Sequence, residues 1–113
     1  MAIKRGRIIW ACFARGQNKK RPAVVISDPG PDGSFFVAVG STQTIDPPPG
    51  HQVELPYYRP CHPKTLLHRR TVVDCTWIEK LLPDAIEEMG GTVPNSVLLD
   101  ILKGALPHLP AIE

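Results

Sequence analysis

A proline that follows three consecutive cations sets the start of a β-strand early in this chain. Lys19, Lys20 and Arg21 run into Pro22, and residues 23–27 read Ala-Val-Val-Ile-Ser, the most strand-like segment of the sequence. Proline fixes its own φ and biases the preceding residue towards extended geometry, so Arg21 is expected at the mouth of a buried strand. There its guanidinium can present a planar fork of donors to a phosphate. The alternative is a solvated loop that ends in a core strand.

Four further segments have the composition of short strands. They are rich in β-branched and aromatic residues, too short for core helices, and bounded by turn-forming residues. Together with a strand over 22–27, we expect strands over 8–13, 35–39, 51–55 and 71–75. Alternation places Ile8, Trp10 and Cys12 on one face of the first strand, which predicts a core position for Cys12.

The C-terminal third is less regular until its last segment. Residues 77–82 fit a helix or a short strand equally well, and residues 83–89 fit at most a helical turn before two glycines. Asn95 is a suitable N-cap for a terminal helix, and Pro107 ends it. The apolar residues of this helix fall on one face: Val97, Leu98, Ile101, Leu102, Ala105 and Leu106. Five or six short strands and a closing helix, without βαβ crossovers, predict a mainly β fold, a small antiparallel barrel or strongly curled sheet.

Length and cysteine content limit the class of protein. At 113 residues the chain suits one domain with a single core, and its longest apolar run is too short to cross a membrane. Three cysteines without a Cys-x-x-Cys pair favour reduced thiols and a cytoplasmic protein. Cys61, His62, His68 and Cys75 invite a zinc site, but their spacing matches no closed Cys/His site, so we expect no metal and no other cofactor.

Charge is distributed unevenly along the chain, although its net value is only +2. Residues 1–22 hold seven basic and no acidic side chains, and residues 59–70 hold four basic and no acidic ones. Residues 23–58 between them hold four acidic and no basic side chains, and residues 71–113 hold two basic against seven acidic. If the two basic segments meet on one face of the fold, they form a site for a polyanion; if they lie apart, they do not.

The order of these segments resembles the MazF/PemK family, the small toxins of toxin–antitoxin pairs. The residues that carry the resemblance are Lys4-Arg5-Gly6 before the first strand, Arg21-Pro22 with the strand to Ser27, Gly40-Ser41-Thr42-Gln43, Val53-Glu54-Leu55, Leu67 with Arg70-Thr71-Val72-Val73-Asp74, and Gly91-Thr92-Val93. These matches run in order over nearly the whole chain, and the ordered set is more specific than any single motif. The resemblance implies that residues 1–113 form one MazF/PemK-like toxin domain, an SH3-like barrel that dimerises.

For function, the resemblance implies a cytoplasmic endoribonuclease that cuts single-stranded mRNA at specific sequences, without metal, and so inhibits growth. In such enzymes the ribose 2′-OH attacks the adjacent phosphate and leaves a cyclic phosphate and a 5′-OH. Arg21 would stabilise charge on the phosphate, while Ser41 and Thr42 would hold the reacting groups in line. The RNA-binding residues expected around them are Arg15, Lys19, Lys20, Gln43, Arg69 and Arg70, with Tyr57 or Tyr58 stacking on a base. The implied protein partner is an antitoxin with an acidic tail.

This chain departs from the family pattern at two acidic positions. Cys12 stands near the end of the first strand, where members usually carry an acid, and Gln17 or Asn18 stands where a loop glutamate is expected. His51 and His68 are the candidate substitutes for that glutamate, because imidazole is a side chain that can act as a general base near neutral pH. Two other functions stay open: a CcdB-like DNA gyrase poison with the same barrel and no nuclease activity, and a plain SH3-like adaptor.

Overall fold

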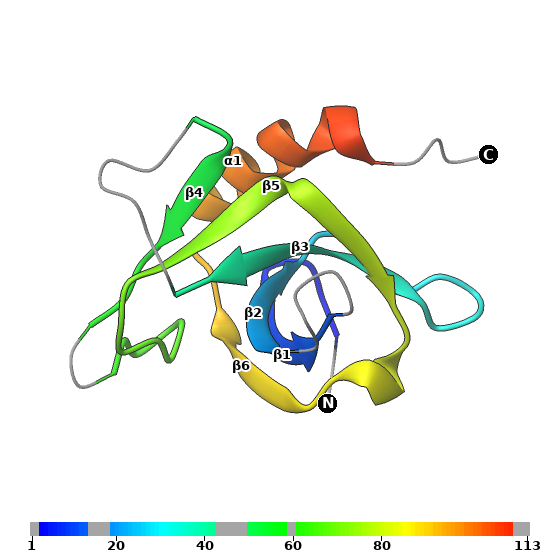
Figure 1. The fold of residues 1–113 in the computed structure, drawn as a ribbon, viewed down its shortest axis with the longest axis horizontal. Helices are drawn as coiled ribbons and strands as arrows, with labels where there is room; N and C mark the ends of the chain where they lie inside the picture. Colours follow the sequence, from blue (N-terminus) through cyan, green and yellow to red (C-terminus); the bar gives the residue numbers. More distant parts are fainter. Residues whose placement is uncertain (1–2, 14–18, 43–49, 59–60, 110–113) are drawn as a thin grey trace.

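The structure of the chain, a computed structural model, describes residues 3–13, 19–42, 50–58 and 61–109. Its elements in chain order are β1 (Arg7–Cys12), β2 (Lys20–Val25), β3 (Phe35–Ser41), β4 (Gln52–Leu55), β5 (Thr71–Leu81), the 3₁₀ helix η2 (Pro83–Ala85), β6 (Glu88–Thr92), α1 (Asn95–Ala105) and the 3₁₀ helix η3 (Leu106–His108). The strands form one sheet in the order β4-β5-β3-β2-β1-β6, and every neighbouring pair is antiparallel. The sheet curls into a partial barrel, and α1 lies against β4 and β5 (Figure 1). The predicted mainly β, curled antiparallel fold with a closing helix is confirmed.

Strand β5 is longer than the sequence predicted, because residues 77–81 continue it. The register of β5 against β3 shifts between two pairs, Ala38 with Ile78 and Gly40 with Val73. The two pairs are two residues apart along β3 but five residues apart along β5, so β5 contains extra residues at this point. The extra residues bend β5 into the arch seen in Figure 1. At the bend, Asp74 Oδ1 accepts hydrogen bonds from the N–H and the hydroxyl of Thr76. The helical alternative for 77–82 is therefore wrong.

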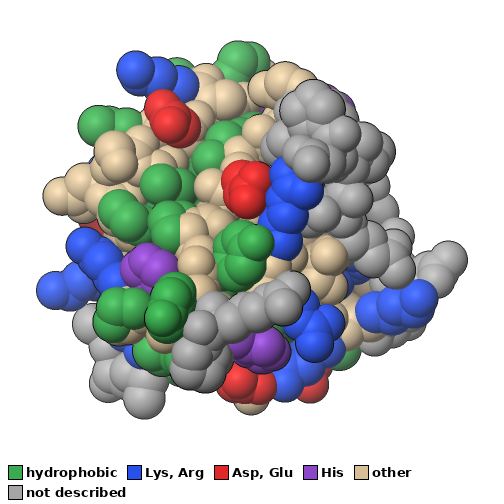
Figure 2. Space-filling model, turned by 90° about the vertical axis from the view of Figure 1, so that its left-hand side faces the viewer, with side chains coloured by type: hydrophobic (Ala, Val, Ile, Leu, Met, Phe, Trp, Pro, Cys, Tyr) green, Lys and Arg blue, Asp and Glu red, His purple; other side chains and the backbone are tan. Residues whose placement is uncertain are grey.

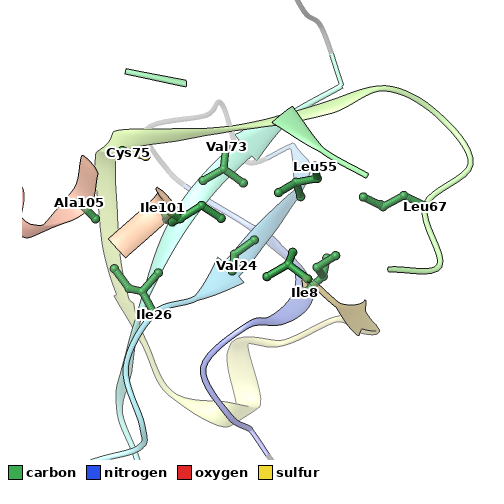
Figure 3. Close-up of a cluster of buried hydrophobic side chains, with 11 residues drawn as sticks. Ile8, Val24, Ile26, Leu55, Leu67, Val73, Cys75, Ile101 and Ala105 are labelled. Carbon is green, nitrogen blue, oxygen red and sulfur yellow. The ribbon is translucent and has the colours of Figure 1, made fainter. Parts of the chain in front are cut away.

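The two faces of the sheet bury separate hydrophobic clusters, as strand alternation requires. One cluster, the helix-side cluster, joins the sheet to α1 (Figure 3) and consists of Ile8, Val24, Ile26, Ala38, Leu55, Leu67, Val73, Cys75, Val93, Ile101 and Ala105. The other covers the opposite face and consists of Ile9, Ala11, Phe13, Ala23, Val25, Phe35, Val37 and Val39. The predicted core position of Cys12 is wrong: it is exposed. On its face, burial falls from Ile8 to the half-buried Trp10, and Cys12 lies opposite exposed Lys20 at the end of the strand.

Strand β6 was missed by sequence reasoning because two glycines stand at its centre. A Cβ at Gly90 would lie 3.0 Å from the Ile8 carbonyl oxygen, and one at Gly91 would lie 2.1 Å from that of Lys64. Glycine permits this approach, and the Gly91 N–H then donates to the Thr65 carbonyl at 3.1 Å. The glycines therefore mark close packing of β6 on β1 and on the segment 61–69, and only η2 corresponds to the helical turn expected over 83–89.

The terminal helix begins at Asn95, one residue earlier than a cap at Asn95 would place it. Pro94 is the N-cap of α1 and makes no side-chain cap hydrogen bond, so the prediction that Asn95 caps the helix is wrong. Ile101 and Ala105 are its buried residues, and η3, which contains Pro107, follows where the helix was predicted to end. Within the described ranges, no helix has the length and hydrophobicity to span a membrane.

Candidate functional site

Arg21 lies at the start of β2, where it pairs with Ala11 of β1. Its guanidinium carbon is 5.4 Å from the centroid of the Trp77 ring, close enough for a cation–π contact. Its Nε is buried and, among the described residues, has no hydrogen-bond partner. Packing on an aromatic face therefore orients this cation, and no carboxylate in the described part of the chain forms an ion pair with it.

The end of β3 brings hydroxyl groups beside Arg21. The β2–β3 register pairs Ala23 with Val39, and continuing it by one further pair on this face sets Arg21 opposite Ser41. A small hollow of about 130 Å³ is lined by Trp10, Lys19, Lys20, Arg21, Pro22, Ser41 and Thr42. The three residues predicted to be catalytic therefore line one hollow, together with two of the predicted RNA-binding lysines.

A larger hollow of about 500 Å³ adjoins the first and shares Trp10, Lys20 and Thr42 with it. Its other walls come from the segment 61–69 and from β6: Thr65, Leu66, Leu67, His68, Arg69, Glu88, Met89 and Gly90. We call the two hollows together the strand-end groove. Figure 2 looks onto the side of the molecule where β3 ends, and basic side chains are spread over it among histidine, acidic and hydrophobic ones. Lys20 and Arg69 come from the two separate basic segments, so these segments meet in the groove.

The remaining predicted residues lie elsewhere. Arg70 forms an ion pair with Glu54 at 3.1 Å and lines neither hollow, although it was predicted to bind RNA. Tyr57 and Tyr58 are exposed and also line neither hollow. The predicted RNA-binding residues Arg15 and Gln43 lie outside the described residues.

The two histidines proposed as substitutes for the missing glutamate are separated by the fold. His68 lines the larger hollow. His51 lines neither hollow, and its Nε2 lies 4.0 Å from Asp74 Oδ2. Among the described residues, no group of three or more His, Cys, Asp or Glu side chains is arranged to hold a metal ion.

Hydrogen bonds fix the conformation of the segment 61–69. His62 Nδ1 accepts hydrogen bonds from the N–H groups of Lys64 and Thr65, each at 3.1 Å. The buried Thr65 hydroxyl donates to the Pro56 carbonyl at 2.8 Å. Leu66 takes a left-handed backbone conformation, with φ of 61°, and remains exposed in the wall of the groove. These contacts give the groove a preformed second wall.

The sequence predicted no site role for two side chains of the groove, Glu88 and Trp10. Glu88 was not predicted as a site residue, because β6 was not predicted. Its Oε1 lies 2.5 Å from Lys20 Nζ, and this hydrogen bond raises the pKa of Lys20. Trp10 was only placed on the same strand face as Ile8 and Cys12; it packs on the helix-side cluster and also lines both hollows. Nearby, a hydrogen bond to Glu87 raises the pKa of the exposed Cys12 thiol.

Comparisons with known proteins agree with this fold. MazF from Deinococcus radiodurans is similar with a TM-score of 0.72 and 18% identity, over 93% of this chain and 94% of that chain. An endoribonuclease in complex with its cognate antitoxin from Mycobacterial species is similar with a TM-score of 0.69 and 16% identity, over 98% of this chain and 100% of that chain. The Mycobacterium tuberculosis toxin MazF-mt6 gives a TM-score of 0.66 and 14% identity, over 90% of this chain and 94% of that chain.

The sequence itself is matched at the level of the family. No curated protein matches the chain. The model of the PemK-like, MazF-like toxins of type II toxin–antitoxin systems matches residues 4–108, which is nearly the whole chain. This chain therefore belongs to the PemK-like, MazF-like toxin family of type II toxin–antitoxin systems.

Proposed function

We propose that this toxin is an endoribonuclease that cleaves single-stranded RNA by attack of a ribose 2′-OH on the adjacent phosphate. The observation that carries the proposal is the Arg21 guanidinium, which is oriented on Trp77 and lies beside the hydroxyl-bearing end of β3. Within the described residues it is tied to no carboxylate, so it is available to a phosphate. The name of the similar Mycobacterial protein, an endoribonuclease, supports the same activity.

In the proposed reaction the 2′-oxygen forms a bond to phosphorus while the bond from phosphorus to the 5′-oxygen breaks. The departing 5′-oxygen takes a proton from solvent water, so the products are a cyclic phosphate and a 5′-OH. Arg21 donates hydrogen bonds to the phosphate oxygens as negative charge develops, and losing one such donor typically costs about 10²–10³ in rate. The hydroxyls of Ser41 and Thr42 keep the phosphate in line with the attacking oxygen. Because the guanidinium supplies the positive charge, we propose that cleavage proceeds without metal.

We assign proton transfer from the 2′-OH to His68. This imidazole lines the larger hollow, which shares Thr42 with the hollow around Arg21. Positioned general acid–base groups contribute about 10²–10⁴ in rate. His51 is set aside because its ring is directed to Asp74, outside the groove.

The test is incubation of purified protein with end-labelled single-stranded RNA in EDTA. We expect wild-type protein to produce fragments with cyclic phosphate and 5′-OH ends. Arg21→Ala and His68→Gln should each lower the cleavage rate by about 10²-fold or more with an unchanged circular dichroism spectrum. Arg5→Ala is the matched control, because Arg5 is an exposed arginine paired with Asp28 that lines neither hollow. Full cleavage by Arg21→Ala would remove this residue from the mechanism.

The proposal extends to the partners of the toxin. We propose that residues 1–113 form a single toxin domain, that the toxin acts as a cytoplasmic homodimer, and that a cognate antitoxin inhibits it by laying an acidic segment over the strand-end groove. Intact RNA together with DNA gyrase trapped on its DNA would instead support the CcdB-like alternative.

A further inference from the structure

The lining of the larger hollow includes an aromatic ring and a charged pair. Glu88 of β6 pairs directly with Trp10 of β1, so their side chains share one face of the sheet. Lys20 pairs with Cys12, two residues farther along β1 and on the same face. All three side chains of this group, Trp10, Lys20 and Glu88, line the larger hollow. These three side chains lie on one face of the sheet, and Arg21, whose side chain packs on Trp77, lies on the other.

Trp10 has the properties of a stacking platform. It is half-buried, it packs on the helix-side cluster, and it also borders both hollows of the groove. The core therefore supports the indole while part of it stays open to the groove. Unpaired bases stack on aromatic side chains held in this way.

The Lys20–Glu88 pair is poorly explained as a stabilising ion pair. The two side chains are 44% and 57% exposed, and ion pairs at that exposure contribute little to folding. An ammonium has three donors and a carboxylate accepts at two oxygens, so both groups keep capacity for a ligand while they remain paired. They present one donor group and one acceptor group side by side at the rim of the Trp10 platform.

We propose that Trp10, Lys20 and Glu88 form a nucleobase subsite that selects guanine in the RNA; this inference rests on the proposed function for the class of ligand. The Watson–Crick edge of guanine carries two adjacent N–H donors beside a carbonyl acceptor. Glu88 accepts from both donors, Lys20 donates to the carbonyl, and the ring stacks on Trp10. Adenine and cytosine offer the carboxylate one amino group, and uracil offers it one ring N–H, so each makes fewer hydrogen bonds here.

The volume of the site agrees with a nucleotide ligand. A hollow of about 500 Å³ is in the range of small-molecule pockets. The smaller hollow holds Arg21 and Ser41 and shares Trp10 with the larger one. A nucleotide whose phosphate lies at Arg21 can therefore place its own or a neighbouring base on Trp10.

Binding without cleavage tests this subsite. Four dye-labelled hexamers of 2′-fluoro RNA, identical except for G, A, C or U at the third position of an oligo-U background, lack the attacking hydroxyl, and anisotropy gives their Kd values. We expect the G hexamer to bind wild-type protein about 10-fold more tightly than the others. Equal Kd values for the four hexamers, or a preference for another base, would overturn the inference.

Two pairs of variants assign the preference to the named side chains. Glu88→Gln should abolish the guanine preference, whereas Glu87→Gln, which removes the same charge at the neighbouring residue outside the hollow, should shift all four Kd values alike. Trp10→Leu should weaken all four hexamers by roughly 10-fold, and Trp10→Phe should retain most of the binding. A guanine preference that survives Glu88→Gln would overturn the inference.

The binding assay is independent of catalysis, so the two proposals fail separately. A protein that prefers the G hexamer but leaves RNA uncut retains the subsite and loses the proposed nuclease activity. A protein that cuts RNA but binds the four hexamers equally retains the activity and loses the subsite.

Discussion

Replacing Gly91 with alanine should separate the two walls of the strand-end groove. The new Cβ would lie 2.1 Å from the Lys64 carbonyl oxygen and 2.5 Å from the Thr65 carbonyl carbon, and both are backbone atoms that no side-chain rotation can move away. The segment 61–69 must then shift from β6. That shift removes the hydrogen bonds from Gly91 N–H to the Thr65 carbonyl and from Thr92 N–H to the Lys64 carbonyl, at 3.1 and 2.8 Å.

The cost follows from those two hydrogen bonds. Each contributes about 1 kcal/mol net, and about 1–3 kcal/mol when a buried partner is left unsatisfied. The expected loss for the two bonds is therefore about 2–6 kcal/mol, a large part of the roughly 5–15 kcal/mol that stabilises a typical domain. With a urea m-value of about 1.5 kcal/mol/M, a loss of about 3 kcal/mol lowers the unfolding midpoint by about 2 M.

Urea unfolding followed by circular dichroism measures this shift, and Gly50→Ala is the matched control. A Cβ at Gly50 meets no atom within 4 Å, and its φ lies outside the left-handed region, so alanine there should be neutral or stabilise by about 0.4–1 kcal/mol. Under conditions where Gly91→Ala remains folded, RNA cleavage should also fall, because the displaced segment carries His68 and Arg69. An unchanged midpoint for Gly91→Ala would refute the close-packing explanation of β6.

Two further predictions concern groups around the groove. His62→Ala should lower the free energy of unfolding by about 1–3 kcal/mol, because two N–H groups lose their acceptor. In His62→Asn the Oδ1 can take the place of Nδ1, so this variant should retain most of the stability. Equal thermal midpoints for both variants would contradict this role of His62. Glu87→Gln should speed alkylation of Cys12 by iodoacetamide at pH 8, followed by peptide mass spectrometry, because Glu87 raises the pKa of that thiol and the thiolate is the nucleophile. The two rates should converge at a pH above the thiol pKa of both proteins, and an unchanged rate at pH 8 would exclude the hydrogen bond.

Local sequence patterns were sufficient for the elements whose burial is regular. β1, β2 and β3 alternate apolar residues between two covered faces, and α1 presents Ile101 and Ala105 at helical spacing, so the curled sheet and its closing helix were predictable. Arg21 and Ser41 could also be predicted as site residues, because Pro22 marks the start of one strand and residues 40–43 mark the end of its antiparallel neighbour. Their register, which decides that they face each other, is a property of strand pairing that no single segment contains.

The errors arise where pairing overrides local preference. Glycine has low strand propensity, yet Gly90 and Gly91 lie at the centre of β6. Only glycine fits at these two positions, because the neighbouring backbone leaves no room for a Cβ. Missing β6 also hid Glu88, so the carboxylate beside Lys20 was absent from the predicted site. Cys12 was assigned to the core from alternation alone, whereas burial on its face of β1 ends before the strand does.

The position of the groove at the strand ends has a mechanical reason. Within the sheet, consecutive side chains of β2 point into two different hydrophobic clusters, so Val24 and Val25 have no common neighbours on one surface. At Lys20 and Arg21 both clusters have ended, and side chains from opposite faces reach the same hollow. A nucleotide bound there can place its phosphate on the Arg21 face and a base on the Lys20 face by passing around the end of the strand. Under the proposed nuclease function and guanine subsite, substitutions at the adjacent residues Arg21 and Lys20 are therefore expected to change cleavage and base selection independently.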